Sequence, residues 1–178
     1  MSEDAPAWAH ERAEVSPHDP RWAARAKAES DQLADLLAPW LTEEIEHIGS
    51  TAVPGLAAKP IVDLMASVTD LDTVVEQATE RLATEGWCLV PPNLDLRPWR
   101  RFYVKPDAEG HREAHLHLIQ ADHPRWTEQI RFRDALRSNT TLAQAYEDLK
   151  RRLATQSGHD REAYTEGKAE FVASVLES

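Results

Sequence analysis

The fold is decided by the stretch Glu46-His47-Ile48-Gly49-Ser50-Thr51-Ala52-Val53-Pro54-Gly55-Leu56-Ala57-Ala58-Lys59-Pro60-Ile61-Val62-Asp63-Leu64-Met65. It predicts a strand, a tight Gly-Ser turn, a short helical segment and then an apolar strand that carries one aspartate. A turn of this kind offers backbone N–H groups to phosphate oxygens. A carboxylate on the next strand can hold a divalent cation beside them. The stretch therefore has the layout of a nucleotide-handling site.

Hydrophobic periodicity in the rest of the chain predicts an α+β protein. Strands are expected at about 43–48, 61–68, 87–90, 101–104 and 114–119, with a turn at 107–110. Helices are expected at about 20–37, 71–85, 124–137, 139–157 and 160–176, with Asp160 as the cap of the last. Because no repeat or linker divides the chain, residues 19–178 are expected to form one domain after an N-terminal extension at 1–18.

The composition limits the classes of partner. A net charge of −11 disfavours a nucleic-acid-binding protein, because phosphate backbones require a basic face. It still permits a locally basic pocket, and Arg97, Arg100, Arg101 and Lys105 gather in one segment. The expected partners are therefore a nucleotide and a small-molecule substrate, while the oligomeric state is not predicted.

The single cysteine and the short apolar runs indicate in which cellular compartment the protein is found. Cys88 has no intramolecular disulfide partner and is expected to be a small buried side chain. The acidic N-terminus has no signal-peptide core, and no apolar run approaches the ~20 residues that span a membrane. We therefore expect a cytoplasmic protein with no membrane partner.

Fixed residue types recur along the chain in a family-specific order. Gly49-Ser50, twelve residues and then Asp63 on an apolar strand resemble the signature of the nucleotidyltransferase superfamily. The longer string from His47 to Asp63, with Lys59-Pro60 inside it, resembles the GrpB family within that superfamily. Further matches to this family are Asp19-Pro20-Arg21-Trp22, His115-Leu116-His117 and Phe132-Arg133-Asp134-Ala135-Leu136-Arg137.

The resemblance extends from about Asp19 to the C-terminus. It implies a nucleotidyltransferase-like fold, in which a mixed β-sheet is flanked by helices and the Gly-Ser turn lies at one end of the sheet. The helical C-terminal half would then form one wall of a cleft.

Asp63 is the first candidate for chemistry. An aspartate within an apolar strand is costly unless it is paired, hydrated or bound to a metal. The resemblance implies a divalent cation ligand that bridges to a nucleotide phosphate, while the structural alternative is a carboxylate paired with Lys59, an arginine or backbone donors. Active nucleotidyltransferases carry a second acidic residue two positions later, where this chain has Met65. A thioether is a poor ligand for Mg²⁺, so the usual two-metal mechanism is in doubt.

His115 and His117 are the second candidates. Alternate residues of a strand point the same way, so both imidazoles can meet one ligand. With Asp63 they could form a two-histidine, one-carboxylate site suited to Zn²⁺, Mn²⁺ or Fe²⁺. Alternatively they bind phosphate, act as acid and base, or are partly exposed residues without a role. We predict Asp63, His115 and His117 as the catalytic and metal-binding residues.

The predicted phosphate-binding residues are Gly49, Ser50, Thr51, Lys59 and Arg101. Glycine lets the backbone approach a ligand, and hydroxyl and N–H groups can hold phosphate oxygens. The alternative is a plain strand-to-helix turn with a capping Ser or Thr.

Three other arginines are expected to have no role in the site. Arg97 and Arg100 should be solvated, and Arg133 should form a surface ion pair with Asp134.

Two functions remain open. The first is an enzyme that uses ATP or another nucleotide with a divalent cation, Mg²⁺ or Mn²⁺ before Zn²⁺. It would transfer a nucleotidyl group to a small acceptor or adenylate a carboxylate for amide ligation. The second is a non-catalytic module that binds a nucleotide or coenzyme, which the resemblance also supports because GrpB-like domains occur fused to dephospho-CoA kinase. Met65 favours the module, and imidazoles that face Asp63 would favour the enzyme.

Overall fold

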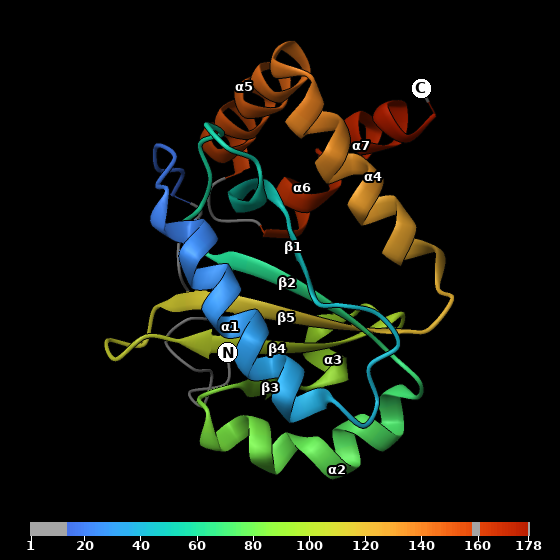
Figure 1. The fold of residues 1–178 in the computed structure, drawn as a ribbon. Helices are drawn as coiled ribbons and strands as arrows, with labels where there is room; N and C mark the ends of the chain where they lie inside the picture. The colour runs from blue at the N-terminus through green and yellow to red at the C-terminus, as the bar shows by residue number, and fades with distance from the viewer. Residues whose placement is uncertain (1–13, 158–160, 178) are drawn as a thin grey trace.

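The computed structural model describes residues 14–157 and 161–177. Within them, strands form one five-stranded sheet in the order β1-β2-β5-β4-β3 (Figure 1). Strands β2 and β5 are parallel, and the other neighbours are antiparallel. The predicted α+β fold with a mixed sheet is confirmed. The strands are β1 (Glu46–Ile48), β2 (Val62–Val68), β3 (Cys88–Val90), β4 (Arg100–Pro106) and β5 (Arg112–Gln120).

The helices lie on both sides of this sheet. Figure 1 shows α1 across the sheet, α2 beside β3 and the C-terminal helices together beyond β1. The C-terminal helical half is confirmed. The helices are α1 (Arg21–Leu37), the 3₁₀ helix η2 (Ser50–Ala52), α2 (Leu71–Thr84), α3 (Pro92–Asp95), α4 (Pro124–Ser138), α5 (Thr140–Ser157), α6 (Arg161–Glu166) and α7 (Ala169–Leu176).

Two helical features differ from the sequence-based expectation. The predicted helix 160–176 is divided into α6 and α7 around Gly167. A Cβ at Gly167 would lie 2.6 Å from the Leu153 side chain, so glycine allows the chain to pack closely on α5 while it interrupts the helix. The short helix α3 was not predicted, because its prolines had indicated a break. The proposed cap, Asp160, lies outside the described residues.

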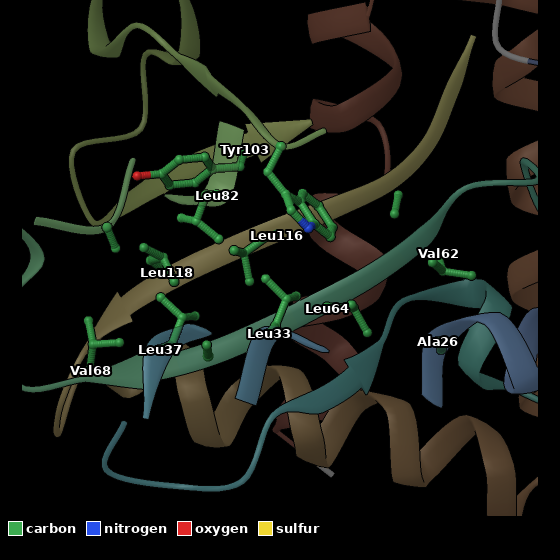
Figure 2. Close-up of a cluster of buried hydrophobic side chains, with 14 of the residues drawn as sticks. Ala26, Leu33, Leu37, Val62, Leu64, Val68, Leu82, Tyr103, Leu116 and Leu118 are labelled. Carbon is green, nitrogen blue, oxygen red and sulfur yellow. The ribbon is translucent and has the colours of Figure 1, made fainter. Parts of the chain in front are cut away.

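The main core lies between the sheet and the helices α1 and α2. Side chains alternate across a strand, so Leu64 of β2 and Leu116 of β5 point to the same face (Figure 2). Leu33 of α1 and Leu82 of α2 cover that face, and all four side chains are fully buried. The opposite face of β2 and β5 is thereby left to the odd-numbered residues, among which are both candidate histidines and Asp63.

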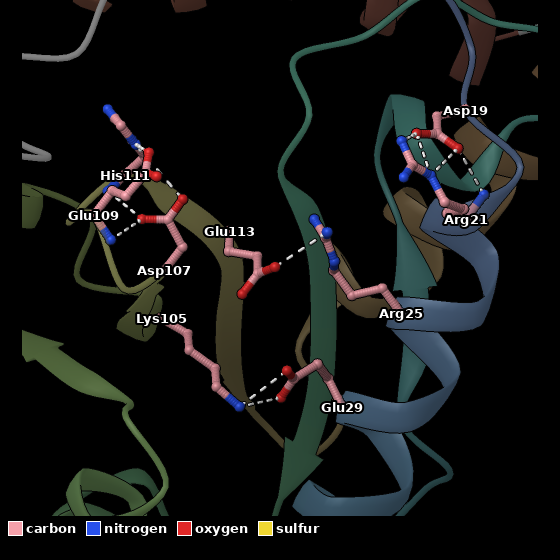
Figure 3. A network of polar contacts seen from close by, with 9 residues as sticks. All are labelled: Asp19, Arg21, Arg25, Glu29, Lys105, Asp107, Glu109, His111 and Glu113. Carbon is pink, nitrogen blue, oxygen red and sulfur yellow. Dashed lines mark hydrogen bonds and ion pairs between the residues drawn. The ribbon is translucent and has the colours of Figure 1, made fainter.

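Polar contacts fasten α1 and the N-terminal segment to the rest of the domain. Lys105 of β4 donates to Glu29 of α1 at 2.7 Å, and Arg25 pairs with Glu113 at 3.1 Å (Figure 3). Of the predicted extension at 1–18, residues 1–13 lie outside the described part. Ser16 pairs with Ala58 through backbone hydrogen bonds of 2.8 and 3.0 Å.

Two expectations about apolar residues have different outcomes. Cys88 is exposed, so the prediction that it is buried was wrong. Cys88 and Val90 share one face of this three-residue edge strand, but only Val90 is buried, in a cluster with Phe102 and Val104. Across the described residues, no helix has the length and apolarity that crossing a membrane requires.

Gly49 brings the loop before η2 directly over Asp63. Its φ of +74° and ψ of −173° lie in a region that is essentially restricted to glycine. A Cβ built there would be 2.9 Å from Asp63 Oδ2. The glycine of the Gly-Ser turn is therefore required both by its backbone and by the carboxylate beneath it.

We predict that Gly49→Ala lowers the free energy of unfolding by about 2–3 kcal/mol, because backbone strain adds to the steric clash. Gly55→Ala is the matched control, since Gly55 has φ +79° but nothing lies within 4 Å of its Cβ position. The control should lose only about 1 kcal/mol. Urea denaturation checks both values, and equal losses would contradict the close approach to Asp63.

Candidate functional site

Asp63, His115 and His117 converge on one carboxylate oxygen. The parallel register places Asp63 beside His115 and Met65 beside His117. His115 Nδ1 lies 3.0 Å from Asp63 Oδ1, and His117 Nε2 lies 3.1 Å from the same oxygen. The three residues that the sequence singled out for catalysis are therefore neighbours on one face of the sheet.

Asp63 is held as a carboxylate. Burial alone would raise its pKa, but the hydrogen bonds from His115 and His117 outweigh that effect and hold the pKa well below its usual range. An ionised carboxylate only accepts hydrogen bonds, so each imidazole donates an N–H to it. The cluster therefore combines one negative charge with two aligned donors.

His117 is further connected to a buried ion pair. Arg100 Nη1 lies 2.6 Å from His117 Nδ1, and the same guanidinium is paired with Asp95 on both carboxylate oxygens. Burial is the main cause that lowers the pKa of His117 to about 4; Asp63 opposes the shift, and Arg100 adds to it. His117 is consequently neutral near pH 7.

The opposite wall of the site comes from α5. Lys150 Nζ donates to Ser50 Oγ at 3.0 Å and to the Ala57 carbonyl at 2.5 Å. Glu147 accepts from the Ala57 N–H at 3.0 Å, so one turn of α5 holds both ends of the loop 50–57. The sequence did not single out Lys150, which is only 3% exposed.

A basic pocket of about 290 Å³ lies between these two walls. Ser50 and Thr51 line it together with Asp63 and both candidate histidines, and Asp63 is the one acid among the described lining residues. Six cationic side chains share the pocket although the whole chain is strongly acidic: Lys59, Arg97, Arg100, Arg112, Lys150 and Lys168. Such a lining suits a ligand with several negative charges.

The structure corrects the assignment of two arginines. Arg101 was predicted to bind phosphate, but it pairs with Asp72 of α2 at 2.6 Å, on the face opposite to the pocket. Arg100 was expected to be solvated, but it is buried and lines the pocket. The reason is the alternation of β4, because Arg101 has the parity of the core residue Tyr103. Counting outward from Tyr103 would have selected Arg100.

The remaining predicted residues have separate positions. Lys59 lines the pocket, with its Nζ 4.4 Å from the centroid of the Tyr164 ring. Thr51 also lines it, but its hydroxyl is bonded to His47 Nε2 at 2.9 Å. Burial is the main cause that lowers the pKa of His47 to about 4. The charge of Asp63 opposes this shift, and the charges of Arg137 and Arg133 add to it.

The helix α4 supports β1 through arginines. Arg133 was expected to form only a surface pair with Asp134, yet it is buried and also contacts Glu46 and the His47 carbonyl. Arg137 donates to the Ala52 carbonyl at 2.8 Å. These contacts fix the segment that leads into the Gly-Ser turn.

The donor set of the cluster fits a transition-metal cation better than a pair of Mg²⁺ ions. One oxygen and two imidazole nitrogens are typical ligands of Zn²⁺ or Mn²⁺, and the three donor atoms lie within 4.8 Å of one another. In a tetrahedral site, neighbouring ligand atoms are about 3.4 Å apart, close to the spacing found here. Met65 has a thioether in place of a second carboxylate and is fully buried with Ile48 and Ile119, so its side chain offers no oxygen to a second metal ion.

We predict that acid destabilises the protein partly through His117. Its pKa is lower in the folded than in the unfolded chain, so between pH 6.5 and 4 the unfolded chain binds more protons and stability falls as pH falls. In urea denaturation, His117→Gln should lose about 2 kcal/mol less than the original chain between pH 7 and 4.5. His111→Gln is the control, because His111 is exposed. The same pH dependence in the original chain and His117→Gln would contradict this role.

Sequence comparisons identify close relatives. A family profile described as "GrpB protein" matches residues 12–178. A UPF0157 protein of Pseudomonas aeruginosa is 40% identical over 93% of this chain and 67% of its own length. The "Glutamate-rich protein GrpB" of Alkalihalophilus pseudofirmus is 31% identical over 89% of this chain and 91% of its own. The chain spans only 47% of the Bacillus subtilis relative YqkA, which is 29% identical.

Solved structures resemble the whole domain. The conserved protein GrpB from Enterococcus faecalis superposes with a TM-score of 0.78 at 28% identity, over 92% of this chain and 95% of its own. The Cid1 poly(U) polymerase, described with Mg and 3'-dATP bound, gives a TM-score of 0.56 at 16% identity, over 86% of this chain and 49% of its own. The second likeness shows the fold alone. The chain belongs to the GrpB family, on a nucleotidyltransferase-like fold.

Proposed function

We propose that the protein binds a nucleotide in the basic pocket and transfers its nucleotidyl group to a small acceptor, or adenylates a carboxylate ahead of amide ligation. The observation that carries this proposal is the convergence, in one pocket, of the Asp63–His115–His117 cluster with six cationic side chains. Both reactions require a polyphosphate held in place and an α-phosphorus whose developing charge is stabilised.

The phosphate tail is assigned to the wall formed by the loop 50–57 and α5. Lys150 donates to Ser50, and its pKa is lowered to about 7, first by burial and then by the repulsion of Lys168. A phosphate group between these side chains would replace repulsion between lysines by attraction to an anion. The ammonium groups of Lys59 and Lys168 lie near one Tyr164 ring, at 4.4 and 4.5 Å from its centroid.

The reactive phosphate is assigned to the Asp63 side of the pocket. Asp63, His115 and His117 are the residues that would hold a divalent cation, which would neutralise phosphate charge and polarise the bond to the leaving group. Before a cation binds, His117 is neutral near pH 7 and donates to the Asp63 carboxylate without adding charge. Arg100 brings a permanent positive charge to the same end of the pocket.

A non-catalytic module that binds a nucleotide or coenzyme is the second candidate. The observation that favours it is the complete burial of Met65 at the position where a second carboxylate would lie. Such a module would retain the phosphate-binding wall and bind its ligand without turnover.

We predict that Lys150→Met weakens binding of ATP and of inorganic tripolyphosphate by about 10- to 100-fold, the effect of losing a hydrogen bond from a charged group. Lys27→Met is the control, because Lys27 is exposed on α1 and pairs with Asp31. Isothermal titration calorimetry measures both. Equal affinities in the original chain and Lys150→Met would contradict the assignment of the phosphate wall.

The pH dependence of the same titration gives a second expectation. Binding of an anion favours the charged form of Lys150, whose pKa in the free protein is about 7. Affinity for tripolyphosphate should therefore fall as pH rises from 7 to 9, and the fall should be smaller in Lys150→Met.

Turnover distinguishes the enzyme from the module. We expect pyrophosphate release when ATP, Mn²⁺ and a mixture of small acceptors are supplied, and its loss in Asp63→Asn. Ser67→Ala is the control, since Ser67 lies further along β2 and contacts Thr42 outside the pocket. Tight nucleotide binding with no pyrophosphate release under Mg²⁺, Mn²⁺ or Zn²⁺ would support the module instead.

A further inference from the structure

Arg100 determines where His117 carries its proton. Its Nη1 lies 2.6 Å from His117 Nδ1. A guanidinium has five N–H donors and no acceptor, so Nδ1 must accept this hydrogen bond through its lone pair. The proton of the neutral ring is then on Nε2, which donates it to Asp63 Oδ1 at 3.1 Å.

The guanidinium is not free to turn away from this contact. Its Nε donates to Asp95 Oδ2 at 2.9 Å, and its Nη2 donates to the other oxygen of the same carboxylate. Arg100 and Asp95 are both more than nine-tenths buried. The carbon at the centre of the guanidinium also lies 4.0 Å from the centroid of the Phe102 ring. Rotation of Arg100 would remove both of its hydrogen bonds to the buried Asp95 carboxylate and leave the longer ion pair with Arg97 at 3.9 Å, which is costly.

A histidine that binds a metal requires the opposite arrangement. Its ligating nitrogen offers a lone pair, and its other nitrogen donates an N–H to a carboxylate, carbonyl or water. If His117 bound a cation through Nε2, its proton would lie on Nδ1 and face Arg100, which cannot accept it. Two donors would then point at each other.

We propose that Arg100, anchored by Asp95, is a positioning residue that holds the proton of His117 on Nε2 and thereby weakens cation binding by that nitrogen. The part of this inference that concerns cation binding rests on the proposed function, whereas the part that concerns the tautomer of His117 does not. In the absence of a cation, the cluster is a hydrogen-bonded unit in which both imidazoles donate to Asp63. A cation has to compete with Arg100 for His117.

The tautomer can be measured without any ligand. Long-range ¹H–¹⁵N correlation spectra report which imidazole nitrogen is protonated, and His117→Gln identifies the signals of His117 among those of eight histidines. At pH 7 we expect the proton of His117 on Nε2 in the original chain. Arg100→Gln should shift it toward Nδ1, because the glutamine oxygen can accept that N–H. A proton on Nδ1 in the original chain would overturn the proposal irrespective of how any variant folds.

Cation affinity tests the consequence, with Co²⁺ alone as the probe in calorimetric titrations. We expect Arg100→Gln to bind Co²⁺ about tenfold more tightly than the original chain, in line with the usual effect of a histidine's outer partner. Arg100→Met removes the donor without offering an acceptor, and it should give a smaller gain. Lys168→Gln is the control for charge, because Lys168 lines the same pocket, interacts electrostatically with Asp63 and loses the same positive charge.

The outcomes separate this inference from the proposed function. An equal gain in Lys168→Gln and Arg100→Gln would show that charge alone acts, and it would overturn positioning by Arg100. Weaker Co²⁺ binding in Arg100→Gln, at an unchanged thermal midpoint, would overturn it as well. If neither the original chain nor any variant binds Co²⁺, the cation role is wrong in both this inference and the proposed function. The assignment of phosphate to Ser50 and Lys150 is tested separately, by the tripolyphosphate titration.

Discussion

The structure of the site depends on one shared acceptor, Oδ1 of Asp63. The parallel pairing of β2 with β5 places Asp63 beside His115 and leaves His117 one pleat further along the strand. Both imidazoles therefore reach the same oxygen, and their N–H groups compensate the carboxylate for its loss of water. Position 49 requires glycine, because a Cβ there would clash with Asp63 where the loop before η2 passes over this carboxylate.

The C-terminal helices complete the site, although they contribute little to the main core. Arg133 and Arg137 of α4 hold β1 and η2, and Lys150 of α5 holds the loop between η2 and β2. These long-range contacts connect segments that are about 85 to 100 residues apart in the sequence. They also bring positive charge to one wall of an otherwise acidic protein, which is the condition for binding a polyanion.

Much of this arrangement could be predicted from sequence, because local patterns of residues specify it. The apolar strand around Asp63, the Gly-Ser turn and the alternating His115 and His117 each follow from periodicity and residue type. The error at Arg101 arose from the phase of β4: a shift of one residue moves a side chain to the other face of a sheet. Tyr103, which is fully buried against α1 and α2, sets that phase.

Other parts of the site could not be predicted from local sequence patterns. Arg133 lies in a string that resembles the family, but no local pattern predicts that Arg133 or Lys150 is buried, since their partners come from β1 and the loop 50–57. Their burial is a consequence of how the C-terminal helices pack, and packing of distant segments is what local patterns specify least. The break at Gly167 has the same origin, because it depends on the approach of α5.

The central claim is that the pocket between Ser50, Lys150 and Asp63 binds phosphate groups and a divalent cation. A crystal structure of the protein grown with pyrophosphate and Mn²⁺ tests it most directly. We expect phosphate oxygens within hydrogen-bond distance of Ser50 Oγ and Lys150 Nζ, and anomalous scattering from Mn²⁺ beside Asp63 Oδ1. Pyrophosphate bound elsewhere on the protein, with this pocket filled only by water, would contradict it.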